Sequence, residues 1–247
     1  MIDTITKLGY SKVEAEELLK VSNNIDEDYE KLKNKYPIQY LIGYVNFYGY
    51  KLTVNNNVLI PRYETEYLVE KVIKYSNKVF NNEKVNILDL CTGSGAIGIV
   101  LSKEINSNVT VSDISSDALE VVKENIKINN TNINIVKSDL LDNINDKFDI
   151  IVCNPPYIAY DEKIDDSVKL YEPNIALYAD DNGLYFYKKI LDRIKDNLNK
   201  RFIIAFEIGY KQADNLIAYS NKYFKNEKIF VEKDLANKDR YLFIIHE

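Results

Sequence analysis

The chain has 247 residues, 46% of them hydrophobic, so it can bury a large core in one domain or in one domain with a small appendage. A formal net charge of -6 argues against the broad electropositive surface that grips a nucleic-acid backbone. The two cysteines, Cys91 and Cys153, lie in apolar segments and His246 is the only histidine, which disfavours a disulfide framework and a metal site.

Helical spacing of apolar residues marks the N-terminal part of the chain, from Ile2 to about Lys35. We expect a small helical domain over residues 1–38. Charged residues interrupt residues 1–20, which therefore contain neither a signal-peptide core nor a membrane-spanning helix. The sequence thus predicts a cytoplasmic protein with no membrane association.

A segment rich in β-forming residues follows at 39–60. Its aromatic and β-branched residues surround Gly49, which allows a turn, and the three residues from Asn55 to Asn57 are typical of another turn. The simplest account is a β-hairpin that links two domains. Pro61 then suits the first turn of a helix that continues beyond it.

Strands and helices alternate through the remainder of the chain, which we expect to be one domain over residues 61–247. This alternation predicts an α/β fold with a largely parallel sheet and helices on both faces. The strands are expected at 85–90, 109–112, 133–136, 148–153, 202–208, 228–231 and 241–246, and the helices between them at 93–102, 117–128, 184–198 and 212–223.

A glycine-rich turn follows the first of these strands, in the run Asp89-Leu90-Cys91-Thr92-Gly93-Ser94-Gly95-Ala96-Ile97-Gly98. Because the turn leads into a helix, backbone N–H groups and the positive helix end face one spot, which suits a nucleotide-like or carboxylate-bearing ligand. Asp113 follows the next strand, where a carboxylate can accept hydrogen bonds from both ribose hydroxyls. A plain structural turn is the alternative for the glycines, and a helix N-cap is the alternative for Asp113.

The same glycine pattern fits a dinucleotide, but two features favour S-adenosylmethionine. Asp89 lies just before the glycines, where its charge would repel a pyrophosphate and suits a sulfonium or amino group. Residues further along the chain also make sense only for methyl transfer. Asp139 and Leu140, past the third strand, are expected at the adenine, with an ordinary loop as an equal alternative. The expected cofactor site comprises Asp89, Cys91, Thr92, Gly93, Ser94, Gly95, Asp113, Asp139, Leu140 and Asn154.

The run Asn154-Pro155-Pro156-Tyr157 ends the fourth strand and so reaches the same sheet edge as the glycine turn. An amide nitrogen is a poor nucleophile because its lone pair is delocalised, and that lone pair must be aimed in line at a methyl sulfonium. The Asn154 side-chain oxygen and the Pro155 main-chain oxygen can accept both hydrogens of an –NH2 group, and Tyr157 offers an aromatic face to a planar acceptor. The prolines keep the turn rigid. We expect these four residues to be catalytic; a strand-ending turn is the alternative.

Motifs in a fixed order over residues 39–247 resemble those of the PrmC/HemK family of protein-(glutamine-N5) methyltransferases. They are Pro61-Arg62-Tyr63-Glu64-Thr65-Glu66, Asp89 to Ile97, Asn154-Pro155-Pro156-Tyr157-Ile158, Tyr171-Glu172-Pro173 with Ala176-Leu177, and Glu207-Ile208-Gly209.

The resemblance implies a seven-stranded, Rossmann-like methyltransferase domain behind a substrate-docking helical domain and a hairpin. It implies transfer of a methyl group from S-adenosylmethionine, leaving S-adenosylhomocysteine, to the glutamine of a Gly-Gly-Gln motif in a peptide-chain release factor. It also implies that residues 91–95, Asp113 and Leu140 hold the cofactor and that residues 154–157 bind the acceptor amide. The helical segment before the hairpin is shorter than is usual in the family.

Other functions remain open at this point. A sister enzyme that methylates glutamine in a ribosomal protein shares every catalytic element and differs in its docking surface. An adenine-N6 nucleic-acid methyltransferase would hold the adenine amine with the same tetrapeptide, but the acidic balance of the chain counts against it, and no direct nucleic-acid substrate is expected. A non-catalytic binding module on the same scaffold is disfavoured by the intact Asn154 and Asp113.

Overall fold

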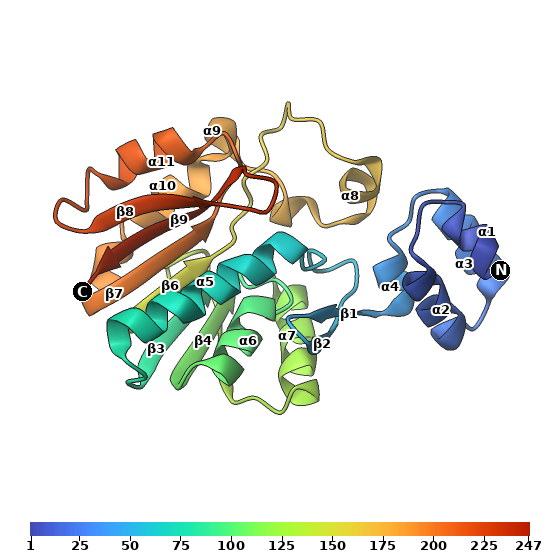
Figure 1. Cartoon of the computed structure of the whole chain (residues 1–247), viewed down its shortest axis with the longest axis horizontal. Coiled ribbons are helices and arrows are strands. Elements are labelled where there is room, and N and C mark those ends of the chain that lie inside the picture. The colour runs from blue at the N-terminus through green and yellow to red at the C-terminus, as the bar shows by residue number, and fades with distance from the viewer.

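Four short helices form the N-terminal end of the computed structural model, which describes residues 1–247 (Figure 1). They are α1 (Ile2–Thr6), α2 (Lys12–Val21), α3 (Ile25–Lys33) and α4 (Ile38–Ile42). Ser11 and Glu14 start α2 with a capping box, each side chain accepting a hydrogen bond from the other residue's backbone N–H. A small core of their own, containing Ile5, Ala15, Leu18, Leu32 and Ile38, holds the helices together. The expected domain boundary between residues 38 and 39 falls inside α4, so the hairpin begins later.

A two-stranded antiparallel sheet, β1 (Tyr44–Phe47) and β2 (Tyr50–Thr53), joins these helices to the larger part of the molecule. Tyr48 and Gly49 form its turn with φ angles of 50° and 81°, the left-handed values that a tight hairpin turn needs. Asn125, on α7 (Ser116–Ile128), accepts the Thr53 N–H at 2.6 Å and donates to the Thr53 carbonyl oxygen at 3.0 Å. The expected hairpin is therefore present and is fixed onto α7.

Seven strands form the central sheet in the order β5-β4-β3-β6-β7-β9-β8. The first five of these run parallel to one another, and β9 pairs antiparallel with both β7 and β8. The strands are β3 (Val85–Leu90), β4 (Ser107–Asp113), β5 (Ile133–Lys137), β6 (Phe148–Cys153), β7 (Leu198–Glu207), β8 (Lys228–Lys233) and β9 (Asp239–His246).

This strand order confirms the expected Rossmann-like fold. The chain moves outward from β3 to β5 and then returns to place β6 on the other side of β3. Ligands of such sheets bind at this reversal, in the crevice outside the carboxyl ends of the strands.

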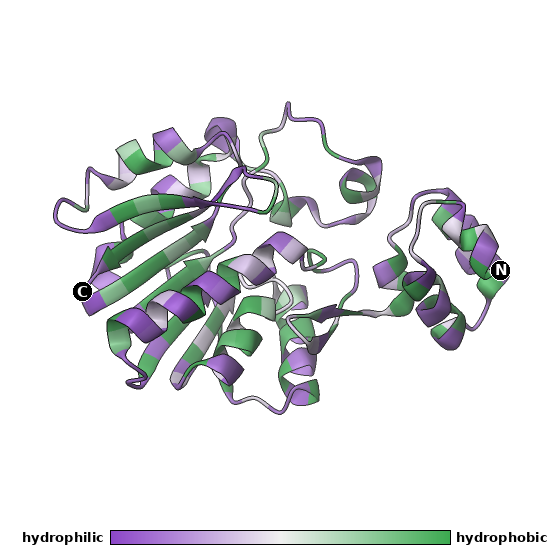
Figure 2. Cartoon of the chain, viewed as in Figure 1, coloured by the Kyte–Doolittle hydropathy of each residue, from purple (hydrophilic) through white to green (hydrophobic).

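Helices cover both faces of the sheet and divide its core into two layers (Figure 1). Ile87, on β3, packs in the layer of α5 and α6, whereas its neighbour Leu88 packs in the layer of α10 and α11. Because the central strands are buried on both faces, they are apolar along most of their length, as Figure 2 shows. The helices of this part are α5 (Tyr63–Phe80), α6 (Ala96–Glu104), α7, α8 (Asp166–Tyr171), α9 (Asp180–Gly183), α10 (Tyr185–Leu191) and α11 (Ala213–Ser220), with the 3-10 turns η1 (Asn174–Ala176) and η2 (Ile194–Asn197).

The segment 158–198 departs most from the sequence-based expectations. The single helix expected over 184–198 is divided into α10 and η2, and α8, η1 and α9 are additional. Left-handed backbone at Asp181 and Asn182 breaks the helical path, with φ angles of 58° and 53°. Gly183 follows at a φ of 81°, and a Cβ there would lie 2.0 Å from the Tyr157 carbonyl oxygen. A tertiary contact thus decides where this helix starts.

The start of α5 also differs slightly from the expected one. Pro61 lies before Arg62, the N-cap of α5, and not in the first turn of the helix. None of the helices combines the length and the apolar content that crossing a bilayer requires.

Candidate active site

A cavity of about 500 Å³ opens at the carboxyl ends of β3, β4 and β6. This volume lies within the range of small-molecule binding sites. Most of the residues expected from the sequence line it: Cys91, Thr92, Gly93, Ser94, Asp113, Asp139, Leu140, Asn154 and Pro156. Asp89, Gly95, Pro155 and Tyr157 do not line it.

The glycine turn forms the floor of this cavity in left-handed backbone. Cys91, Gly93 and Gly95 have φ angles of 59°, 55° and 83°, and Gly95 is the N-cap of α6. Further on, Gly98 allows α6 to approach β4, since a Cβ there would lie 2.4 Å from Val111. The glycines therefore serve both the shape of the turn and the packing of the helix behind it.

Asp89 lies behind the turn and organises it from within the core. Its side chain is fully buried, and Oδ2 accepts hydrogen bonds from the Thr92 hydroxyl and from the Gly98 N–H at 2.8 Å. The other oxygen, Oδ1, has no hydrogen-bond partner. Burial outweighs the two hydrogen bonds and raises the pKa of Asp89 to about 7. The expected direct contact of this carboxylate with a cofactor is not supported, because Asp89 is not part of the cavity wall.

Asp113 lines the cavity beside the glycine turn. Its Oδ2 accepts the Gly93 N–H and its Oδ1 accepts the Ser115 N–H, each at 2.9 Å. Burial raises the pKa of Asp113, and these backbone hydrogen bonds oppose the rise. The alternative role of N-cap falls to Ser115, which accepts the Ala118 N–H at the start of α7. Asp113 is thus left as a carboxylate that faces the cavity.

The loop after β5 brings Asp139 and Leu140 to the wall of the cavity. Leu140 has left-handed backbone with a φ of 46°, and the Ser138 hydroxyl donates to its carbonyl oxygen at 2.7 Å. The same hydroxyl accepts the Asn143 N–H at 2.9 Å. Ser138 therefore fixes the loop that presents the apolar Leu140 side chain.

The tetrapeptide after β6 contributes Asn154 and Pro156 to the cavity wall. Asn154 donates from Nδ2 to the Thr65 hydroxyl oxygen at 3.3 Å. No donor occupies the Asn154 side-chain oxygen or the Pro155 carbonyl oxygen within the protein. The Asn154 side-chain oxygen is therefore an unpaired acceptor at the cavity wall, and the carbonyl oxygen of the adjacent Pro155, which does not line the cavity, is also unpaired.

Tyr157 is placed differently from the expectation. Its hydroxyl donates to the Glu207 carboxylate at 3.3 Å, its carbonyl oxygen accepts from the Gln212 side chain at 3.0 Å, and its ring packs against the buried core. Burial raises the pKa of the Tyr157 hydroxyl, and the Glu207 carboxylate adds to the rise. Since Tyr157 does not line the cavity, this placement does not support stacking of its ring on an acceptor.

Several functional candidates were not identified as such from the sequence. Glu172 is 5% exposed; it forms an ion pair with Arg62 and accepts the Ile60 N–H at 3.2 Å. This pair ties the start of α5 to the segment that follows the tetrapeptide. Arg62 also lines the cavity, as do Tyr185, Phe186, Lys189 and Arg193. For Arg62 the sequence leaves open whether it orients the hairpin, touches the substrate or belongs to a solvated charge cluster. Only the order of motifs points to Glu172, and nothing in the sequence pattern points to the residues of α10 and beyond.

Comparison with known families and sequences gives consistent matches. A family model described as "Methyltransferase small domain" matches residues 65–170. A release factor glutamine methyltransferase from Lactococcus lactis subsp. lactis is 43% identical over 218 residues, which cover 87% of this chain and 79% of that protein. One from Bacillus cereus is 36% identical over 240 residues, covering 92% and 85% of the two chains.

Solved structures with a similar fold are methyltransferases. One from Pyrococcus furiosus superposes with a TM-score of 0.59 at 18% identity and covers 80% of this chain and 89% of its own. Methanocaldococcus jannaschii TYW2, solved in complex with AdoMet, superposes with a TM-score of 0.53 at 15% identity and covers 82% and 84%. At these identities the similarity concerns the fold alone.

Proposed function

The chain belongs to the release factor glutamine methyltransferase family, and we propose that it methylates the side-chain amide nitrogen of the glutamine in the Gly-Gly-Gln motif of a peptide-chain release factor. The observation that carries this proposal is the high identity over nearly the whole chain, which spans about four-fifths of the relatives' own length. The free side-chain oxygen of Asn154 at the cavity wall and the unpaired carbonyl oxygen of the adjacent Pro155 support it, because two such acceptors can take the two hydrogens of an amide –NH2 group.

We further propose that the cavity holds S-adenosylmethionine, which supplies an electrophilic methyl group on a sulfonium. The residues present fit this cofactor. The Asp113 carboxylate faces the cavity with accepting capacity left for ribose hydroxyls, and Leu140 offers an apolar surface to the adenine. Residues 91–95 would hold the methionine portion against the start of α6. Asp89 would act indirectly, by shaping that turn.

In the proposed mechanism, Asn154 and Pro155 orient the acceptor. The Asn154 side-chain oxygen and the Pro155 carbonyl oxygen accept the two amide hydrogens, which leaves the nitrogen lone pair directed toward the methyl group. Holding the reactants in line is the main contribution to rate. The methylated nitrogen is cationic and strongly acidic, so it loses a proton without a dedicated base among the residues of the site.

Mass spectrometry tests the proposal directly. A purified bacterial-type release factor is incubated with the protein and S-adenosylmethionine, and the peptide that contains Gly-Gly-Gln is examined. One added methyl group on that glutamine is expected, and a release factor with this glutamine replaced by alanine should gain none. Transfer to a ribosomal protein or to nucleic acid in parallel incubations, with none to the release factor, would overturn the assignment of the substrate.

A further inference from the structure

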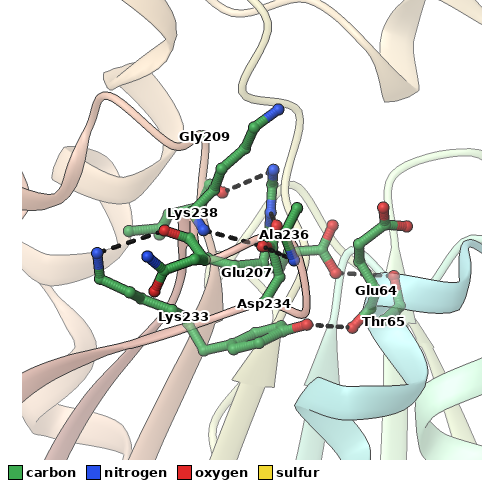
Figure 3. Close-up of polar contacts among 12 residues, drawn as sticks. Glu64, Thr65, Glu207, Gly209, Lys233, Asp234, Ala236 and Lys238 are labelled. Carbon is green, nitrogen blue, oxygen red and sulfur yellow. Dashed lines mark hydrogen bonds and ion pairs between the residues drawn. The ribbon is translucent and has the colours of Figure 1, made fainter.

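Three elements meet at the cavity wall, which Thr65 and Asn154 line, in a chain of side-chain hydrogen bonds. Asn154, at the end of β6, donates to Thr65 on α5 at 3.3 Å. The Thr65 hydroxyl in turn donates to Glu207, at the end of β7, at 2.7 Å, and Figure 3 shows this second contact. Thr65 is 5% exposed and Glu207 is 2% exposed. Neither residue has a role in the mechanism so far, although both lie in motifs noted in the sequence.

The direction of these hydrogen bonds determines how the Asn154 amide is turned. Glu207 accepts the Thr65 hydroxyl hydrogen, so the Thr65 oxygen has only lone pairs left for another partner. A lone pair of the Thr65 oxygen then faces Asn154, which must present its –NH2 group there. The side-chain oxygen of Asn154 is consequently left for the substrate. The opposite orientation would point –NH2 at –NH2, and methyl transfer would lose one of its two acceptors.

Glu207 holds the other end of the tetrapeptide as well. Its second carboxylate oxygen accepts the Tyr157 hydroxyl, so one carboxylate restrains both Asn154, through Thr65, and Tyr157. Between them lie two prolines, which have no N–H with which to anchor the turn. Burial raises the pKa of Glu207, and the Thr65 and Tyr157 hydroxyl donors and the nearby Arg240 guanidinium oppose this rise.

We propose that Thr65 and Glu207 are positioning residues that fix the orientation of the Asn154 amide for transfer to glutamine. This inference rests on the proposed function, because it assumes that the Asn154 oxygen accepts the substrate amide. In this proposal the Thr65 and Glu207 side chains act through Asn154, and neither touches the reacting atoms.

The test compares kcat at saturating cofactor and release factor. Thr65→Val has the same shape but no hydroxyl. We expect it to lower kcat about 10- to 100-fold, because a rotated Asn154 amide no longer holds the substrate nitrogen in line with the methyl group. Thr65→Ser keeps the hydroxyl and is expected to recover most of this rate. The dissociation constant for S-adenosylmethionine, measured by calorimetry, should not change in either variant. A wild-type kcat in Thr65→Val, or an equal loss in Thr65→Ser, would overturn the proposal.

A double-mutant cycle separates positioning through Asn154 from a general structural effect. If Thr65 acts through Asn154, Thr65→Val should cause no further loss of kcat in an Asn154→Ala protein, whereas independent effects would multiply. Glu207→Gln, whose amide can donate to Thr65, is expected to behave as Thr65→Val does in the same cycle and provides the comparison if the valine variant fails to fold. Multiplying losses would contradict the inference. Failure of the proposed function itself is visible separately, as absence of glutamine methylation by the wild-type protein.

Discussion

Asn154 and Asp113 show how backbone geometry prepares single side chains for the proposed reaction. Both follow parallel strands at the carboxyl edge of the sheet, and both are already held by hydrogen bonds within the protein, to Thr65 in one case and to backbone N–H groups in the other. Side chains fixed in this way lose little further freedom when a ligand binds. The two residues should nevertheless affect different steps when they are replaced.

Asn154→Ala is expected to retain cofactor binding and to lose most methyl transfer. The acceptor amide loses one of the two oxygens that orient it, which corresponds to about 2–4 kcal/mol of transition-state stabilisation. Single-turnover kinetics with saturating cofactor, together with calorimetric titration of S-adenosylmethionine, would measure the two effects. An unchanged rate would contradict the proposed mechanism.

Asp113→Ala is expected to weaken cofactor affinity chiefly. Loss of charge-assisted hydrogen bonds to the ribose costs about 1.5–3 kcal/mol of binding free energy. Calorimetry gives the dissociation constant, and kcat at saturating cofactor serves as the control, which should change much less. A pure defect in kcat with normal affinity would count against the ribose assignment.

The stability of the fold depends on pH through Asp89. Its pKa of about 7 in the folded protein lies above the ordinary value of 3.8, so the folded state retains a proton that the unfolded state has lost between these values. This residue therefore contributes stability at low pH that is lost as pH rises from about 4 to 7. In Asp89→Asn this loss should disappear, changing the free energy of unfolding relative to wild type by a few kcal/mol between pH 4 and 8, at about 1.4 kcal/mol for each unit. Denaturant unfolding across this range is the measurement; a constant difference between the two proteins would refute the prediction.

Among the secondary-structure elements, the strands of the sheet could be predicted from the sequence because they are buried on both faces. Apolar runs such as 85–90 and 148–153 match β3 and β6 at both ends. The helix boundaries in the segment 158–198 could not be predicted, because they depend on tertiary contacts such as the approach of Gly183 to the Tyr157 carbonyl oxygen. Local periodicity contains no information on such contacts.

The residues of the candidate site also differ in whether the sequence predicts their position. Residues that follow strands, such as Asp113 and Asn154, could be placed because parallel strands bring their carboxyl ends to one edge. The residues that hold Asn154 in place could not be predicted in this way. Thr65 and Glu207 are 142 positions apart in the chain, and only the packing of α5 against β7 brings their side chains together. The placement of Tyr157 away from the cavity also depends on tertiary contacts, with Glu207 and with the core layer of α10 and α11.

Asn125 on α7 joins the hairpin to the glycine turn of the cavity, and its loss should destabilise both. Besides bonding the backbone of Thr53 in the hairpin, its fully buried side chain donates to the carbonyl oxygen of Ser94 in the glycine turn at 2.9 Å. Asn125→Ala leaves these buried groups without partners, at a cost of about 2–4 kcal/mol. Asn129→Ala is the matched control, because its side chain bonds the hairpin at Lys51 from a more exposed position and should cost less than about 1 kcal/mol. Denaturant unfolding of both variants checks the ranking.

The whole molecule consists of a helical N-terminal part, the hairpin and the sheet domain (Figure 1). One contact between the N-terminal part and the sheet domain involves α8. Tyr36, just before α4, packs edge-on against Tyr171 of α8 with ring centroids 4.9 Å apart. The Tyr171 hydroxyl donates to the Asn34 carbonyl oxygen at 2.8 Å, and Lys35 pairs with Asp166. The segment that follows the tetrapeptide therefore touches the N-terminal helices as well as the cavity.

Tyr36→Ala should loosen α8 without weakening the cofactor site. The variant removes an aromatic contact worth about 0.5–1.5 kcal/mol beyond its buried area. Hydrogen exchange of residues 166–171 should become faster, while the affinity for S-adenosylmethionine remains unchanged. Lys35→Ala is the control, since an exposed ion pair contributes little. Equal protection of α8 in wild type and Tyr36→Ala would contradict this account.

Two adjacent residues anchor the segment 158–178. Tyr171 contacts the N-terminal part through the Asn34 carbonyl oxygen, and Glu172 forms an ion pair with Arg62 at the cavity wall. Two adjacent residues thus connect a surface remote from the chemistry with the wall of the reaction chamber. Thermodynamic linkage between such sites is reciprocal. Because Tyr171 and Glu172 are adjacent, a displacement of α8 by a protein bound at the N-terminal helices would reach the Arg62–Glu172 ion pair as well. By the same reciprocity, a ligand that stabilises this ion pair through α8 would also stabilise the Tyr36–Tyr171 contact.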